Sequence, residues 1–143
     1  MKIYKRPESV LVIIVAKNSG RVLMLRRNDD PDFWQSVTGS LESNETPFET
    51  ACREIKEETG FDVEQNPPQD LFHSIIFEIF AHFRHRYAPD VSHCKEHWFK
   101  LVLDEEQMPL LTEHTDFRWL MPQEAAKLTK SWSNSQAILE FAI

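Results

Sequence analysis

The first forty residues carry two long apolar runs separated by a polar turn. SVLVIIVA (9–16) is continuously apolar and rich in β-branched residues, and RVLMLRR (21–27) becomes polar only near its end. Between them KNSG has turn chemistry, so the two runs are predicted to pair as a hairpin. A shorter strand, FWQSVTG (33–39), follows a polar loop and closes at Gly39, one of three glycines in the chain. A residue used so sparingly indicates a requirement of the backbone at that position.

The next segment carries the signals of one helix. Thr46 is placed to be its N-cap, Pro47 occupies the first helical position, and Glu49 completes a capping box. Gly60 is typical of a helix C-cap, and Gly39 is typical of a turn. A helix over residues 47–59 is therefore predicted.

One face of this helix is predicted to pack on the core. At about 100° per residue, the apolar stripe consists of Phe48, Ala51, Cys52, Ile55 and Thr59. Glu54, Glu57 and Glu58 fall to one side of that stripe and form an acidic patch along its border.

The remainder of the chain mixes strands and helices. The predicted elements are a long strand at 71–86, its hairpin partner at 96–103, a short strand at 117–120, a helix opening at Pro122, and a last helix capped by Ser133 with Gln136 at the third helical position. Strands combined with three helices, without a repeating βαβ period, predict an α/β (α+β) fold with a mixed sheet sandwiched between helices.

Composition narrows the class of protein. With 143 residues and 41% hydrophobic content, the chain is predicted to form a single domain over residues 1–143. Apolar runs stay well below the roughly 20 residues that span a bilayer, and MKIYKRPESV lacks the apolar middle of a signal peptide, so a cytoplasmic protein is expected. The two cysteines, Cys52 and Cys94, are expected to be free thiols.

The formal net charge of −7 argues against binding to nucleic acid polymers or to membranes, because such surfaces need basic patches. An acidic protein can still bind a small anionic substrate when metal ions intervene. The glutamates crowded into REIKEETGF (53–61) also favour bound metal ions, since like charges three and four residues apart otherwise repel by roughly 0.2–0.5 kcal/mol per pair. A solvated helix face is the simpler interpretation of three acids alone, but more than three acids are specified here.

The segment 39–61, GSLESNETPFETACREIKEETGF, resembles the signature of the Nudix hydrolases at every specified position. The matching residues are Gly39, Glu45, Arg53, Glu54, Ile55, Glu57, Glu58, Gly60 and Phe61. The resemblance implies a Nudix fold and metal-dependent cleavage within the phosphate chain of a small-molecule substrate.

Elementary chemistry agrees with that implication. Glu54 and Glu58 are i,i+4 neighbours whose oxygens can converge, and hard oxygen ligands suit Mg²⁺, with Mn²⁺ as an alternative. Arg53 lies four residues before Glu57 and can orient it, while Glu57 or Glu58 can act as general base on a water molecule. Spacing leaves the identity of the base open. Glu45 is either an outer metal ligand or a hydrogen-bonding partner in its loop.

Other stretches resemble one subfamily, the bacterial dihydroneopterin triphosphate pyrophosphohydrolases. They are YKRP (4–7), DDPDFWQSVTGS (29–40), FEIFAHFRHRYAPDV (77–91), TEHTDFRWL (112–120) and LTKSWSNSQAI (128–138). The subfamily removes pyrophosphate from dihydroneopterin triphosphate to leave the monophosphate, a step in folate biosynthesis. The resemblance implies Glu113 as a further metal ligand, and substrate contacts from Lys5, Arg27, Thr38, Phe77, Glu78, Ile79, Phe80 and Ser131.

Alternation within FEIF places Phe77 and Ile79 on one face of the predicted strand and Glu78 and Phe80 on the other. One face is expected to stack on a flat pterin ring while Glu78 accepts its N–H groups.

Four alternatives stand beside this interpretation. A housecleaning pyrophosphohydrolase for oxidised or ordinary purine nucleotides would share the chemistry, because pterin and guanine share a hydrogen-bonding edge. A nucleotide-sensing module without turnover is disfavoured by the complete set of signature glutamates, and an RNA 5′-end pyrophosphohydrolase by the absence of a basic stripe. The pairs His82/His85 and His93/His97 have zinc-like spacing, but no Cys or acid completes a four-ligand set.

Overall fold

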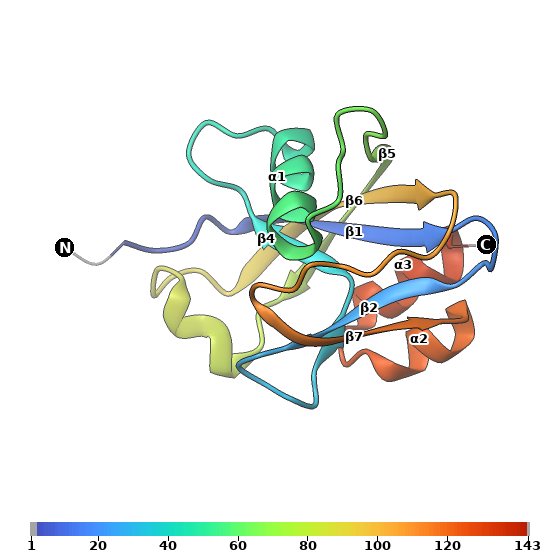
Figure 1. Cartoon of the computed structure of the whole chain (residues 1–143). Helices are drawn as coiled ribbons and strands as arrows, with labels where there is room; N and C mark the ends of the chain where they lie inside the picture. Colours follow the sequence, from blue (N-terminus) through green and yellow to red (C-terminus); the bar gives the residue numbers. More distant parts are fainter. Residues whose placement is uncertain (1–2, 143) are drawn as a thin grey trace.

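The computed structural model describes residues 3–142 (Figure 1). In chain order its elements are β1 (Glu8–Ala16), β2 (Val22–Arg27), β3 (Trp34–Gln35), β4 (Val37–Ser40), α1 (Pro47–Thr59), β5 (Gln69–Glu78), the 3₁₀ helix η1 (Ala81–Arg86), β6 (His93–Leu103), β7 (His114–Leu120), α2 (Pro122–Leu128) and α3 (Trp132–Phe141). Within these residues, no helix is long and apolar enough to cross a membrane.

The strands of the described residues form one seven-stranded mixed sheet. Its path is β3-β2-β1-β6-β5, with β4 pairing with β1 and β7 pairing with β2. β1 and β6 run parallel, from the pair Glu8 and Lys95 to the pair Ala16 and Leu103. The hairpin partner predicted for β5 is confirmed, because β5 and β6 pair antiparallel.

β1 and β2 diverge after the turn that joins them. Among the described residues, they are in register at Val15 and Val22. Further along, β1 pairs with β4 at residues 9–12 while β2 pairs with β3 at residues 25–26. The sheet therefore splits at one end, and this split is where the cavity described below opens.

The core occupies both faces of the sheet. Alternate residues of β1 point to opposite faces, so Val12 and Ile14 pack with Ile55 of α1 while Leu11 and Ile13 pack with the helices at the C-terminus. Burial on both faces explains why this strand is a continuous apolar run. The predicted sheet sandwiched between helices is confirmed, with α1 on one face and α2 and α3 on the other (Figure 1).

The helix boundaries of α1 follow the predicted capping residues. The Thr46 side chain accepts from the Glu49 backbone N–H, the Glu49 side chain accepts from Thr46, and Gly60 ends the helix in a left-handed conformation with φ 75°. The helix predicted to open at Pro122 is also present. The predicted cap of the last helix was wrong, because Ser131 rather than Ser133 accepts from the Asn134 backbone N–H.

Two strand predictions were also wrong in extent. The segment 33–39 forms two short strands, β3 and β4, on opposite sides of the split. The strand predicted over 71–86 ends at Glu78, and the chain turns into η1. There the Phe80 ring packs edge-on against Phe33 with centroids 5.8 Å apart, so a tertiary contact overrides the local strand preference.

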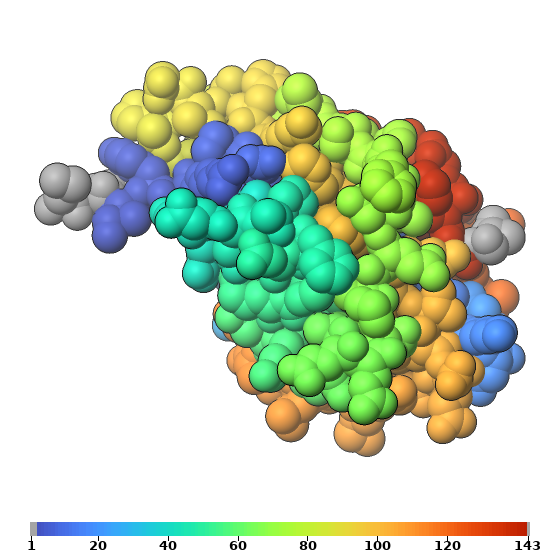
Figure 2. Space-filling model, turned by 90° about the horizontal axis from the view of Figure 1, so that it is seen from above, coloured from blue at the N-terminus to red at the C-terminus, as the bar shows by residue number. Residues whose placement is uncertain are grey.

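The N-terminal segment lies against η1 and the loop that precedes α1. The Lys5 backbone N–H donates to the Arg86 carbonyl at 2.8 Å, and the Lys95 N–H donates to the Pro7 carbonyl at 3.1 Å. In Figure 2 this segment (blue) runs between the residues after η1 (yellow) and the start of the α1 region (teal). Lys5 is thereby placed at the mouth of the split.

Candidate active site

A cavity of about 440 Å³ opens where the sheet splits. Its walls come from β1, β2, β3, β4, β5, α1, η1, β6, the residues around the start of β7, the N-terminal end of α3, and the N-terminal segment that carries Lys5. Most of the predicted site residues line it: Lys5, Arg27, Thr38, Arg53, Glu54, Glu57, Glu58, Phe77, Phe80, Glu113 and Ser131. Residues more than 120 positions apart are thus gathered around one space.

Glu78 and Ile79 are not among the residues that line this cavity. The Glu78 side chain is 70% exposed and lies 3.3 Å from Arg84, whereas Ile79 is buried. The predicted alternation was wrong beyond Glu78, because β5 ends there and the chain turns. Phe77 and Phe80, predicted to face opposite sides, both line the cavity.

The buried face of α1 differs from the predicted stripe. Ala51, Ile55 and Thr59 are buried as predicted, but Phe48 is 44% exposed and Cys52 is half-buried. Glu54 and Glu58 do not border the packed face: they belong to it, and Glu58 is only 1% exposed. Glu57 is exposed at the rim. The helix therefore presents two carboxylates to the interior.

Gly39 of β4 makes room for the first of these carboxylates. A Cβ atom at residue 39 would overlap the carboxyl end of Glu54. The turn predicted for Gly39 was wrong, because it lies within a strand and is not among the residues with positive φ. Glycine is required here for a close approach of side chain to backbone.

Glu58 is a buried acid with little compensation from the protein. Among the described residues, neither of its carboxylate oxygens has a hydrogen-bond partner. Burial, and next the neighbouring Glu54, raise the pKa of Glu58 well above its ordinary value. The His114 Nε2 atom lies 3.6 Å away, but burial, followed by the charge of Arg27, lowers the pKa of His114 to about 4, so this imidazole carries no compensating charge near neutral pH.

These orphaned oxygens fit a hard divalent cation, which would satisfy them and the Glu54 carboxylate together. Burial also raises the pKa of Glu54, although the neighbouring Arg53 guanidinium opposes that rise. Within residues 3–142, no three Cys, His, Asp or Glu side chains are already gathered at a spacing that holds a metal ion. Glu57 and Glu113 line the same cavity from farther out.

Arg53 joins the acids of α1 to the loop before it. Its guanidinium donates to both oxygens of Glu45 at 2.7 and 2.9 Å, and to Glu54 at 2.7 Å. It also lies 3.3 Å from Glu57, the contact that the i,i+4 spacing predicted. Glu45 is fully engaged as a hydrogen-bond acceptor, since it also accepts from Thr50 and from the Glu42 backbone. Of the two roles open for Glu45, the structure favours the hydrogen-bonding one.

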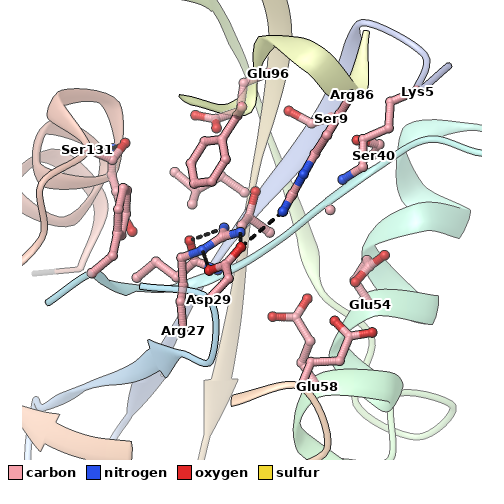
Figure 3. A pocket seen from close by; sticks show the side chains of 18 of the residues that line it. Lys5, Ser9, Arg27, Asp29, Ser40, Glu54, Glu58, Arg86, Glu96 and Ser131 are labelled. Carbon is pink, nitrogen blue, oxygen red and sulfur yellow. Dashed lines mark hydrogen bonds and ion pairs between the residues drawn. The ribbon is translucent and has the colours of Figure 1, made fainter. Parts of the chain in front are cut away.

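Cations line the middle of the cavity. Arg27 and Arg86 both bind Asp29, at 2.7 and 3.0 Å, and both stack on the Phe83 ring, at 4.7 and 5.0 Å from its centroid (Figure 3). Two guanidiniums against one carboxylate leave net positive charge, to which Lys5 adds. Desolvation, and then the charges of Arg86 and Arg27, lower the pKa of Lys5, so an incoming anion would relieve repulsion there.

Sequence reasoning assigned no role to several other residues of the cavity. Glu96, Gln35 and Asn134 are buried and line it. Gln35 and Asn134 lie in the stretches 29–40 and 128–138 quoted for the subfamily resemblance, whereas Glu96 comes from a stretch without a motif. Only the alternation of strand 93–103 carries a signal: Glu96 stands where an apolar residue is expected, between the buried Cys94 and Trp98. Arg86 lies in the quoted stretch 77–91, but no role was predicted for it.

Comparisons with known proteins show which family this chain belongs to. The family model described as NUDIX domain matches residues 5–141. The dihydroneopterin triphosphate diphosphatase of Haemophilus influenzae is 52% identical over 140 residues, which are 96% of this chain and 89% of the relative. The protein of the same name from Escherichia coli (strain K12) is 55% identical over 144 residues, covering 99% of this chain and 96% of the relative.

Among solved structures, the E. coli dihydroneopterin triphosphate pyrophosphohydrolase has a TM-score of 0.95 at 55% identity, covering 99% of this chain and 98% of that one. An Ap4A hydrolase of C. elegans has a TM-score of 0.74 at 19% identity and covers 94% of each chain, a likeness of fold alone. This chain therefore belongs to the NUDIX domain family. Its segment 39–61 resembles the signature of that family.

Proposed function

We propose that this chain is a metal-dependent pyrophosphohydrolase that converts dihydroneopterin triphosphate into dihydroneopterin monophosphate and pyrophosphate. The observation that supports this chemistry is the content of the cavity. Buried Glu58, whose carboxylate oxygens have no hydrogen-bond partner among the described residues, lines it together with Glu54. The cations Lys5, Arg27 and Arg86 line the same cavity. The identity of 52–55% with relatives named for this activity supports the substrate.

The metal would be held by Glu54 and Glu58, with Glu57 and Glu113 as further ligands, and Mg²⁺ or Mn²⁺ suits these oxygens. When bound, such an ion neutralises charge on the phosphate oxygens and lowers the pKa of bound water.

The protein's own residues divide the remaining tasks. Glu57 or Glu58 accepts a proton from the attacking water, and Arg53 holds Glu57 in place through their 3.3 Å contact. The triphosphate oxygens accept hydrogen bonds from the N–H groups of Lys5, Arg27 and Arg86. Thr38 and Ser131 line the same cavity. Water adds across the bond between the α- and β-phosphates, and the two products leave as monophosphate and pyrophosphate.

The wider assignments belong to the same proposal. Residues 1–143 would act as a single Nudix domain, in the cytoplasm, on a small-molecule triphosphate rather than on a nucleic acid polymer or a membrane. Its product would enter folate biosynthesis.

The decisive experiment compares kcat/KM for dihydroneopterin triphosphate, dGTP, dATP and 8-oxo-dGTP, first with Mg²⁺ and then with EDTA, while identifying the released phosphate. A strong preference for the pterin, release of pyrophosphate and loss of activity in EDTA are expected. Similar kcat/KM values for all four substrates, or higher values for the purine nucleotides, would instead indicate a housecleaning nucleotide pyrophosphohydrolase. Absence of phosphate release from every substrate would indicate a sensing module instead.

A further inference from the structure

Glu96 is a second buried carboxylate of the cavity, distinct from those on α1. It lies on β6, is 5% exposed and belongs to the cavity lining. In Figure 3 it stands well apart from Glu54 and Glu58, with Arg27 and Asp29 drawn between them. An anion held by the cavity cations could therefore extend its other end toward Glu96.

The partners of Glu96 are neutral donors. The Trp98 indole N–H donates to its Oε1 at 2.9 Å, and the Ser133 hydroxyl also hydrogen-bonds to the carboxyl group. Among the described residues, no lysine, arginine or histidine forms an ion pair with it. A carboxylate has about four acceptor positions, so two donors leave acceptor capacity unfilled.

Burial of the Glu96 carboxyl group lowers the stability of the folded state. Burial raises the pKa of Glu96 to about 7, and the hydrogen bonds from Trp98 and Ser133 oppose that rise only in part. A buried polar group of this kind is destabilising unless a further partner satisfies it. Because it faces a cavity that also has aromatic walls, including Phe77 and Phe80, that partner is expected to be a flat ligand with N–H donors.

A 2-amino-4-oxopyrimidine ring has such donors. Its ring N–H and exocyclic amino group lie side by side and match the two oxygens of a carboxylate. Pterin and guanine both carry this edge. Adenine instead presents an acceptor nitrogen beside its amino group, and this lone pair would face a carboxylate oxygen.

We propose that Glu96 is the specificity-determining residue of the cavity, accepting hydrogen bonds from the 2-amino-4-oxopyrimidine edge of the substrate. This inference rests on the proposed function for the choice of pterin. It replaces the sequence-based assignment of that role to Glu78, which lies outside the cavity lining.

The test compares Glu96→Gln and Glu96→Asp with Glu105→Gln, a matched change at an exposed glutamate. Steady-state kinetics are measured on dihydroneopterin triphosphate, dGTP, dATP and inorganic tripolyphosphate. Glu96→Gln is expected to raise KM for the pterin and for dGTP at least about 20-fold, because a charge-assisted pair is lost. The KM values for dATP and tripolyphosphate, which lack the 2-amino-4-oxopyrimidine edge, should stay within about threefold of those of the parent chain. Every KM value for Glu105→Gln should do the same.

Three outcomes would overturn the inference. Equal losses on all four substrates would show that Glu96 only maintains the fold, and unchanged kinetics would show that it does not meet the ring. A selective loss in Glu78→Gln, with Glu96→Gln unaffected, would return the role to Glu78.

A binding measurement separates this inference from the proposed function. Fluorescence titration with neopterin and with guanosine, both without phosphate and with EDTA present, should show weaker binding to Glu96→Gln than to the parent chain. If the parent hydrolyses dGTP better than the pterin triphosphate, the proposed substrate fails, yet selective loss of guanosine binding would still support Glu96. Equal binding of both ligands by parent and variant would reject it.

Discussion

Glu54 reaches the wall of β4 because residue 39 has no side chain. The overlap that a Cβ atom would make involves three atoms of the Glu54 carboxyl end, so even alanine forces this group to move. A displacement of about 1 Å at a catalytic group can cost on the order of 100-fold in rate.

Gly39→Ala is therefore expected to lower kcat by about 10- to 100-fold while the protein stays folded. Gly20→Ala is the matched control: its φ of 74° strains alanine, but no atom lies within 4 Å of the added Cβ. That control should lose about 1 kcal/mol of stability and keep its activity. Kinetics and thermal unfolding of both variants check the prediction, which fails if Gly39→Ala retains full kcat.

The orphaned oxygens of Glu58 lead to a second prediction. Glu58→Gln and Glu54→Gln should each lower turnover by about 10³-fold or more, because each removes a charged metal ligand. The metal-free stability of Glu58→Gln should not fall, since that change removes a buried acid whose oxygens have no hydrogen-bond partner among the described residues. Glu49→Gln, which keeps the capping box on the same helix, should behave like the parent chain. Near-normal turnover in both test variants would refute the metal role.

Among the elements, α1 and its preceding loop act as one unit through Arg53 and Glu45. The hydrogen bonds from Arg53, the largest effect, lower the pKa of Glu45 to about 2, from an ordinary value of 4.5. The folded state therefore favours the carboxylate. Its stabilisation is complete above pH 4.5 and is lost as the pH falls through about 2.

Glu45→Gln should thus lower the free energy of unfolding by up to about 3 kcal/mol at pH 6. The difference from the parent should shrink steadily between pH 4.5 and pH 2, where the parent's own carboxyl becomes protonated. Urea unfolding of both chains across this range measures it. A difference that does not vary with pH would show that Glu45 acts by packing rather than by charge.

At the other end of the cavity, α3 is tied to the link between β3 and β4. Asn134, 1% exposed, accepts from the Ser36 backbone N–H at 2.8 Å and donates to the Ser36 hydroxyl at 2.9 Å. Asn134→Ala would leave that backbone N–H buried without a partner.

Asn134→Ala is expected to cost about 1–3 kcal/mol of stability for this reason. Ser135→Ala, the next position on the same helix, should be nearly neutral. Denaturant unfolding compares the two, and equal effects would show that the Ser36 contact is not what holds α3 in place.

Considered as a whole, the molecule carries a net charge of −7, and part of that charge is concentrated in one cavity. A dication bound there would stabilise the native state alone, because the unfolded chain scatters these carboxylates. Binding at 100 times the dissociation constant contributes about 2.7 kcal/mol.

Mg²⁺ at that level should raise the Tm by about 5–10 °C, and EDTA should reverse the shift. Scanning calorimetry of the parent chain and of Glu58→Gln measures it, with NaCl at the same ionic strength as the control. A shift that persists in Glu58→Gln would place the stabilising ion elsewhere.

The sequence by itself determined those features that depend only on residues close together in the chain. The capping residues Thr46, Glu49 and Gly60 set the ends of α1, because each acts within a few residues of its own position. The chemistry was indicated by the resemblance of segment 39–61 to the Nudix signature, and i,i+4 spacing brings Glu54 and Glu58 to the same side of any helix. The pairing of β5 with β6 was also predicted, because hairpin partners need only be neighbours in sequence.

Tertiary structure decided what depends on distant neighbours. β5 ends at Glu78, where Phe80 packs on Phe33, and Glu96 rather than the expected Glu78 belongs to the cavity lining. The burial of Glu58 follows from how α1 lies on the sheet, which helical periodicity alone cannot specify. Local periodicity shows which residues share a face. Only long-range packing determines what that face meets, and hence which charges are buried, which are paired and which are left for a ligand.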